Sequence, residues 1–284
     1  MHKPPIAFIR LTGACIAGIL LLSGCLRRWE PAPDIPANTC RLQRYFFTGD
    51  DVSGLGNTGY TRTYNSSGKL IRLSGLPGHS SNDTIDVRIA YGGNKTWLIS
   101  QANTTDTLMK LTTGAGGRLL SYTADIHFSG GFTERAQYQY NSNGTVKQIF
   151  RQVQSSSVSY QDTIRFGYDS YQNVLYRQTS RYDIRYGYAY DYSKPATGSY
   201  YTYFTFPELI TQTILEMAGL APYQPHHAIS NATAATSGYP LMNLSFDNFH
   251  IDSSHKLLSY NLEGRATSGY SLQWNCQQTS PASK

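Results

Sequence analysis

The tyrosines are the residues in this sequence whose type and spacing point most clearly to chemistry. Four of them occupy alternate positions between 186 and 192, so a β-strand there would align four rings on one face. Such a face either packs in a core or binds a ligand, because tyrosine rings stack on sugars and anchor protein partners. Two nearby arginines could hydrogen-bond to hydroxyls or carboxylates of the same ligand. The predicted binding surface consists of Arg181, Tyr182, Arg185, Tyr186, Tyr188, Tyr190 and Tyr192.

Sequence signatures of catalysis and metal binding are missing from the chain. It contains no nucleophile elbow, metal-protease helix, phosphate-binding loop or Cys-x-x-Cys pair. The adjacent His226 and His227 project in different directions, and Asp50 with Asp51 fits a solvated turn better than a calcium site. We therefore predict no catalytic residue, no metal, no cofactor and no enzymatic activity. A polysaccharide or cell-wall hydrolase is an alternative, which would pair an aspartate with Glu208, Glu216 or Glu263.

The N-terminal 25 residues have the layout of an export signal. Lys3 and Arg10 precede the run Leu11–Leu22, which is nearly all apolar or small. This run is shorter than the roughly 20 residues of a membrane-spanning helix and suits a cleavable signal. Its end, Leu22-Ser23-Gly24-Cys25, resembles the lipobox of bacterial lipoproteins. The resemblance implies cleavage before Cys25 and lipid on the Cys25 thiol, which anchors the protein in a membrane.

The composition divides the chain into four parts. Residues 1–24 form the signal peptide, and residues 25–38 form a tether in which three prolines prevent regular structure. Residues 39–279 form a single β-rich domain, which is large enough to bury a core without an added metal. Residues 280–284 are a tail.

The charge of the chain is mildly basic and scattered. Removal of the signal takes away Lys3 and Arg10, which lowers the net charge of +6 by two. Lys and Arg stand singly among polar and aromatic residues rather than on one element, which argues against a nucleic-acid partner. The predicted partners are a membrane, through the lipid, and a glycan or an envelope protein.

Two cysteines stand at opposite ends of the β-rich domain. Cys40 and Cys276 remain once Cys15 leaves with the signal and Cys25 takes the lipid. Because an exported protein meets an oxidising compartment, the two can form a disulfide. A bridge over so long a loop stabilises by roughly 5 kcal/mol in the chain-entropy model, and it would lay the first and last strands side by side. Two buried free thiols are the alternative.

Short β-prone stretches and turns repeat along the domain. In each copy an aromatic residue ends a strand, Asn or Asp opens the turn, and Gly or Asn supplies the positive φ that closes it. The flanking stretches alternate as half-buried strands do, for example at Ile164 and Phe166. The repeats predict an all-β fold, a long antiparallel meander that forms either a curled sheet or two layers. The clearest copies are residues 64–70, 140–146 and 168–174.

One segment breaks the β pattern. Residues 207–219 place apolar side chains on one helical face, with Pro207 in the first turn and Gly219 where a C-cap belongs. This spacing predicts one short amphipathic helix near 207–219. The polar stretch 222–240 predicts a long loop, with strands resuming at Leu241.

The repeated turns are similar to the YD-type hairpin repeats of wall and toxin-shell proteins. Together with the lipobox, they resemble a group of Bacteroidetes envelope lipoproteins. The resemblance touches most of the domain and implies an antiparallel β structure at the outer membrane, with no catalytic residues to carry over. Acidic residues after the lipidated cysteine accompany surface export in such organisms, whereas Leu26-Arg27-Arg28 follow Cys25 here. The sequence therefore leaves both a periplasmic and an external position open.

Three Asp-Thr-aliphatic triplets recur in the domain. Each resembles the acceptor for O-glycosylation in the same bacteria, and each equally suits the start of a strand after a turn. The sequence leaves both interpretations open. The threonines concerned are Thr84, Thr107 and Thr163.

Together, these patterns predict a non-enzymatic, membrane-anchored lipoprotein of the cell envelope. It would bind a glycan or a protein partner through a tyrosine-rich β surface. A structural subunit of an outer-membrane assembly is the second hypothesis, and a polysaccharide hydrolase is the third.

Overall fold

The β-prone stretches form sixteen strands in the described part of the computed structural model, which comprises residues 41–48, 58–77, 84–101, 106–127, 131–196, 210–223, 225–237, 239–262 and 265–276. These residues belong to one unit that spans 35–284. The strands are β1 (Arg41–Thr48), β2 (Thr58–Tyr64), β3 (Leu70–Pro77), β4 (Thr84–Gly92), β5 (Lys95–Ser100), β6 (Thr107–Thr113), β7 (Leu119–Ile126), β8 (Phe132–Tyr140), β9 (Val146–Ser155), β10 (Ser159–Tyr168), β11 (Val174–Thr179), β12 (Arg185–Pro195), β13 (His227–Thr236), β14 (Tyr239–Ile251), β15 (Leu257–Leu262) and β16 (Arg265–Asn275). A 3-10 turn (Ala115–Gly117) precedes β7, and the helix α2 (Ile210–Met217) precedes β13.

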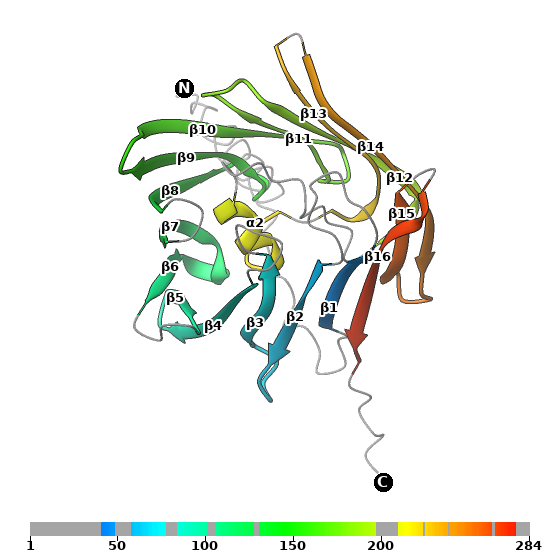
Figure 1. Ribbon diagram of the computed structural model, residues 1–284, viewed down its shortest axis with the longest axis horizontal. Coiled ribbons are helices and arrows are strands. Elements are labelled where there is room, and N and C mark those ends of the chain that lie inside the picture. The colour runs from blue at the N-terminus through cyan, green and yellow to red at the C-terminus, as the bar shows by residue number, and fades with distance from the viewer. Residues whose placement is uncertain are drawn as a thin grey trace, which may run out of the picture. The chain divides into compact units, whose positions relative to one another are not determined.

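The sheet closes on itself as a barrel (Figure 1). Every strand pairs antiparallel with its neighbour in sequence, and β1 pairs with β16 to complete the ring. The prediction of an antiparallel all-β meander is therefore confirmed. The sequence leaves open a curled sheet or two layers. The structure has a curled sheet, which closes so that none of the sixteen described strands is an edge strand. Closure removes the unpaired backbone groups that an edge would present to other chains.

The predicted hairpin turns share one backbone pattern. In the turn after β2, the Asn65 N–H donates to the Lys69 carbonyl oxygen, and the Gly68 N–H donates to the Asn65 carbonyl oxygen. The same pair of bonds recurs at 141–145, 169–173 and 252–256. The sequence predicts Gly or Asn at the left-handed position of each turn, but in the last two copies this position holds other residues. The residues with positive φ at this position are Gly68, Gly144, Gln172 and His255.

Side chains alternate between the lumen and the outer wall of the barrel. On β8, Glu134, Ala136 and Tyr138 are buried, whereas Thr133 and Arg135 are exposed. This alternation follows from the two-residue period of a strand. The same rule along the other strands fills the lumen with a core that is rich in tyrosine and leucine. Its largest fully buried side chains are Tyr45, Phe47, Tyr60, Leu73, Leu98, Met109, Leu111, Tyr122, Ile126, Ile149 and Tyr186.

Helix α2 lies within the ring of strands (Figure 1). It occupies part of the predicted segment 207–219, and Gly219 takes the left-handed conformation expected of a C-cap, with φ of +64°. Arg62 of β2 donates from Nε to the Met217 carbonyl oxygen over 2.7 Å, which satisfies an unpaired group at the helix end. Gln212 Nε2 donates to the Tyr122 hydroxyl of β7 over 2.6 Å. Contacts on different strands thus fix the helix as a plug. No helix among the described residues is long and apolar enough to cross a membrane.

Strand β13 corrects the prediction of a long loop over 222–240. Residues 227–236 pair with β12 and β14, and β14 begins at Tyr239 rather than Leu241. Ala228, Ala232 and Ala234 supply three of the five buried positions of β13. Alanine is depleted in strands, so an alanine-rich strand gives little β signal in the sequence.

Candidate binding groove on the outer wall

Three of the four β12 tyrosines, Tyr186, Tyr188 and Tyr190, share one face of the strand as their spacing predicts, and that face lines the lumen. Tyr186 and Tyr190 are 2% and 7% exposed, and the Tyr190 hydroxyl donates to the Val174 carbonyl oxygen over 2.8 Å. The partly buried Tyr188 accepts a hydrogen bond from Arg177 Nε over 3.0 Å. The structure thus places these three tyrosines toward the core, which is the alternative that the sequence leaves open beside a binding surface. A tyrosine ring can pack in a core when its hydroxyl has a polar partner there. The alternation of residues along one strand does not show which partners the other strands supply, so it does not show which way the tyrosines face.

Arg181 and Tyr182 keep exposed positions in the turn between β11 and β12. The Arg181 guanidinium carbon lies 3.6 Å from the ring centroid of Tyr160 and 4.8 Å from that of Tyr182. Arg185 lies in the same way over Tyr176, at 4.2 Å. An exposed contact between a cation and an aromatic ring contributes about 0.5–1 kcal/mol. These residues stay available to a ligand at the surface.

Tyr192 lies near the other end of β12, so the structure does not bring it together with Arg181. It is 46% exposed and its ring centroid lies 5.4 Å from those of Tyr171 and His227. The Tyr192 hydroxyl donates to Asp169 Oδ2 over 2.9 Å. This aromatic cluster caps the turn between β10 and β11.

The acidic residues of β8 and β10 point into the lumen. Arg151 of β9 donates from Nε and Nη2 to Asp162 Oδ2, over 3.0 and 2.7 Å, and all of these side chains are buried. Arg151 Nη1 also lies 3.9 Å from Glu134 Oε1. Glu134 Oε2 accepts a bond of 2.8 Å from Thr211 of α2, and the Tyr122 hydroxyl donates to Oε1. This network ties four neighbouring strands, β7–β10, to the plug.

Burial raises and the Arg151 charge lowers the pKa of both carboxyl groups in this network, and the net shift differs between them. Burial alone would raise the pKa of Asp162, but Arg151 and hydrogen bonds from Ser180 and Arg181 outweigh it and hold the pKa below its ordinary value. Burial dominates at Glu134 and raises its pKa, although Arg151 pulls in the opposite direction. Asp162 therefore stays ionised as the close partner of Arg151.

A second buried pair holds the C-terminal half of α2. Arg177 Nη1 of β11 lies 2.6 Å from Glu216 Oε1, with both side chains at least nine-tenths buried. The Tyr223 hydroxyl donates to the same oxygen over 3.1 Å. Glu216 is the only one of the three predicted hydrolase glutamates within the described residues, since Glu208 and Glu263 lie outside them. Its carboxylate binds the barrel wall through Arg177, which is a structural role.

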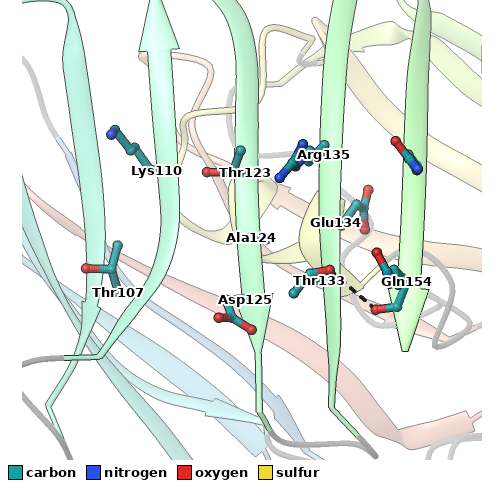
Figure 2. A pocket seen from close by; sticks show the side chains of 10 residues that line it. Thr107, Lys110, Thr123, Ala124, Asp125, Thr133, Glu134, Arg135 and Gln154 are labelled. Atoms are coloured by element: carbon teal, nitrogen blue, oxygen red, sulfur yellow. Dashed lines mark hydrogen bonds between the residues drawn. The ribbon is translucent and has the colours of Figure 1, made fainter. Parts of the chain in front are cut away.

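The outer wall over β6–β10 carries an open groove, which we name the outer groove. It consists of two adjoining depressions of about 460 and 610 Å³ that share Arg135 and Gln152. Volumes of this size are common for ligand sites. Figure 2 shows Lys110, Thr123 and Arg135 side by side on neighbouring strands of this wall. The exposed or half-buried side chains that line it are Thr107, Lys110, Thr123, Asp125, Thr133, Arg135, Gln137, Phe150, Gln152, Gln154, Gln161, Thr163 and Ser180.

Strand register arranges this lining in rows. Arg135 pairs with Thr123 on one side and with Gln152 on the other. Gln152 in turn pairs with Gln161, and Thr123 with Lys110, so a first row of five polar side chains crosses five strands. Directly paired side chains on neighbouring strands stand about 5 Å apart. The second row consists of Gln137, Phe150 and Thr163.

The polar groups of the first row have no protein partners in the parts of the chain that the structure describes. Arg135, Gln152 and Gln161 make no side-chain hydrogen bond or ion pair there. Each glutamine amide both donates and accepts, whereas the guanidinium group only donates. Phe150, which is 39% exposed, adds one aromatic face. The arrangement suits a polar ligand with several hydroxyl or acidic groups.

The other predicted sites fall in different parts of the chain. Thr107 and Thr163 lie on the outer wall and line the outer groove, while the side chain of Thr84, like Cys25, Asp50 and Asp51, lies outside the described residues. The structure does not test whether these threonines carry glycans. Among the described residues, no three His, Cys, Asp or Glu side chains gather as a metal site.

Cys276 is disulfide-bonded. It follows Asn275, which pairs with Arg41 at the start of β1. Cys40 precedes Arg41 in the sequence and lies outside the described residues, so its bond to Cys276 stays a prediction. The first and last strands lie side by side, as the sequence predicts, because β1 pairs with β16.

Comparison with solved structures relates the barrel to two porin-like proteins. One from Bacteroides uniformis matches with a TM-score of 0.59 and 11% sequence identity, over 82% of this chain and 96% of its own. One from Bacteroides vulgatus matches with a TM-score of 0.59 and 12% identity, over 84% and 99%. At such identity the likeness shows a shared fold. Neither match bears on the YD-type repeat resemblance, which stays a prediction. No protein-family model and no curated protein matches the sequence.

The tyrosine-centred prediction missed the outer groove. Its lining comes from β6–β10, whose sequences show polar residues at alternate positions, such as Thr133, Arg135 and Gln137. That alternation is the available signal, because it marks a wall in contact with water. The convergence of separate strands into one groove depends on register, which no single strand encodes.

Proposed function

We propose that this protein is a non-enzymatic lipoprotein of the cell envelope that binds a glycan through the outer groove. The first row of the groove carries the proposal, because its donors and acceptors stand in register and have no protein partners among the described residues. Sugar hydroxyls both donate and accept hydrogen bonds, as the amides of Gln152 and Gln161 do. Phe150 in the second row offers an apolar face on which a sugar ring can stack.

The proposed attachment to the membrane rests on the N-terminal sequence. Leu22-Ser23-Gly24-Cys25 supplies the lipobox, and lipid on Cys25 would hold the barrel at the outer membrane. The fold shared with porin-like proteins of Bacteroides agrees with a place in the envelope.

The outer wall favours a barrel that stands in water over one that spans the bilayer. Transmembrane barrels turn an apolar band outward and a polar surface inward. Here Arg88, Arg135 and Arg165 are exposed within strands, while the lumen is filled by tyrosine, leucine and the plug. An arginine that faces lipid at the bilayer midplane costs about 2–4 kcal/mol. We therefore propose that the lipid, and not the sheet, enters the membrane.

A glycan array probed with full-length protein in neutral detergent tests the binding function. We expect a saturable hit that the double variant Gln152→Ala/Gln161→Ala weakens about tenfold, because two lost hydrogen bonds contribute about 1–3 kcal/mol. Gln273→Ala is the matched control, since Gln273 is exposed on β16, outside the groove. Binding that is unchanged in the groove variant, or the absence of any hit, would contradict the proposal.

Planar-bilayer recordings test the placement of the barrel. We expect no channel conductance from the purified protein, because α2 and the side chains around it fill the lumen. Stable unitary currents would show that the sheet spans the bilayer, and they would overturn the water-exposed placement.

The exposed tip of the β13–β14 hairpin supports a second candidate, a structural subunit of an outer-membrane assembly. Tyr239 is 74% exposed and Leu241 is 46% exposed, and exposed aromatic and aliphatic groups of this kind commonly anchor protein partners. Cross-linking from position 239 in intact envelopes would yield a discrete protein adduct under this hypothesis. A glycan-binding role predicts no such adduct.

A further inference from the structure

Charge is segregated between the two faces of β8–β11. Among the side chains of these four fully described strands, the outer face carries Arg135, Lys147 and Arg165 and no carboxylate. The acidic residues of the same strands, Glu134 and Asp162, are both buried on the inner face. An outer wall of one sign attracts ligands of the opposite sign.

The inner carboxylates cannot neutralise the outer cations. Asp162 and Glu134 lie in the network around Arg151, and Glu216 binds Arg177. Each inner carboxylate thus already faces an inner arginine. The outer cations keep their full charge toward solvent.

The outer cations stand at and beside the outer groove. Arg135 lines both depressions, and Lys110 lines the first together with one exposed carboxylate, Asp125, so cations outnumber carboxylates among the exposed groove side chains. Arg165 is two residues along β10 from Thr163, which lines the second depression, and it pairs with Gln148 of β9. Within the described residues neither arginine has an ion-pair partner. Arg185 of β12 continues the same wall, since it pairs with Gln178, which pairs with Arg165.

We infer that the ligand of the outer groove is an acidic polysaccharide. Its carboxylate or sulfate groups bind the guanidinium groups of Arg135 and Arg165, and its hydroxyls bind the amides of Gln152 and Gln161. A guanidinium group matches such anions because its N–H donors form paired hydrogen bonds with two oxygens. This inference rests on the proposed glycan-binding function and adds the class of glycan. A flat anionic membrane would meet the cations but would leave the groove amides and Phe150 unused, so the observations favour a glycan chain.

Oligogalacturonate and its methyl ester provide a matched pair of probes, because they share a backbone and differ in charge. Calorimetric titration of the full-length protein in neutral detergent should show about tenfold tighter binding of the acid form at low salt, because hydrogen bonds to charged groups are stronger than those between neutral groups. The affinity for the acid form should fall as salt is raised, because screening weakens exposed charges. Dextran sulfate against dextran repeats the comparison for sulfate groups.

Arg135→Gln/Arg165→Gln should remove most of the preference for the acid form and leave binding of the methyl ester within about twofold of the parent. Arg88→Gln is the matched control, because it removes one exposed positive charge from β4, away from the groove. Both arginines of the double variant are exposed, so the barrel should fold, which circular dichroism checks.

Four outcomes would overturn the inference. Equal affinity for acid and ester probes would reject the acidic class and leave the glycan-binding function in place. A preference that the double variant retains would place the anion outside the groove. Binding to phosphatidylglycerol vesicles, lost in the double variant, with no binding to either polysaccharide, would make the wall a membrane-docking surface. Absence of binding to every probe and to the glycan array would reject the proposed function itself.

Discussion

Arg151 and Arg135 stand on neighbouring strands of one wall and face opposite ways. Arg151 is fully buried and donates two hydrogen bonds to Asp162. Arg135 is exposed, lines the outer groove and has no ion-pair partner among the described residues. Because side chains alternate along a strand, a shift of one position decides which role an arginine takes. The inner face of the wall maintains the fold, and the outer face carries the groove for which binding is proposed.

The largest expected effect comes from breaking the inner pair. Asp162→Ala leaves Arg151 buried without its closest partner, which typically costs about 3–5 kcal/mol in the free energy of unfolding. Chemical denaturation followed by circular dichroism measures this loss. A loss below about 1 kcal/mol would contradict the structural role of the pair.

The Arg177–Glu216 pair allows a sharper version of the same test. Arg177→Met should destabilise the protein by about 3–5 kcal/mol, because it leaves Glu216 buried and unpaired. The double variant Arg177→Met/Glu216→Leu should recover most of this loss, since apolar side chains of similar volume often replace buried ion pairs without cost. If the double variant is as unstable as the single one, the lost hydrogen bonds of Arg177 and Tyr223, rather than the unpaired charge, dominate.

Acid should weaken the inner face through Asp162. Its pKa is lowered in the folded state, so the carboxylate stabilises the fold at pH values above its unfolded pKa of about 3.9. That contribution is lost as the pH falls through the lower folded value. Asp162→Asn does not titrate, so the free energy of unfolding of the variant should depend less on pH below 4 than that of the parent. Parallel pH profiles would contradict the assignment.

The smallest expected effect on stability comes from the outer face. Arg135→Gln should change the free energy of unfolding by less than about 0.5 kcal/mol, because its exposed side chain has no hydrogen-bond or ion-pair partner in the described part of the barrel. The same variant should weaken binding of the acid probe. Strong destabilisation would show that Arg135 takes part in the fold, and the contrast between the two faces would fail.

The regular hairpins could be predicted from the sequence because their signals are local. Asn65, Asp169 and Asp252 open turns whose backbone bonds recur as the sequence indicates, and the helix ends before Gly219. Closure could not be predicted in the same way. It depends on the pairing of Arg41 with Asn275, residues at opposite ends of the domain.

The orientation of the tyrosines illustrates a second limit. The spacing of Tyr186, Tyr188 and Tyr190 indicates a shared face but not which face, since an amphipathic ring suits both the lumen and the surface. The choice is made by polar partners such as Arg177 on another strand. Likewise, the outer groove combines Arg135, Gln152 and Gln161 from three strands, and only strand register brings them into one row.

The β1–β16 pairing also determines how the barrel would carry mechanical load. Arg41 lies opposite Asn275, so the chain enters and leaves at the same rim. A force transmitted along the barrel axis from an anchor ahead of β1 would act parallel to that strand. Backbone hydrogen bonds of an antiparallel pair run perpendicular to the strands, so the bonds from β1 to β16 and β2 would be loaded together in shear. A strand peeled away sideways would instead lose its bonds one at a time. If the lipid anchor and the binding function proposed above hold, this pairing would let the barrel resist a pull at its N-terminus while the outer groove holds a polysaccharide.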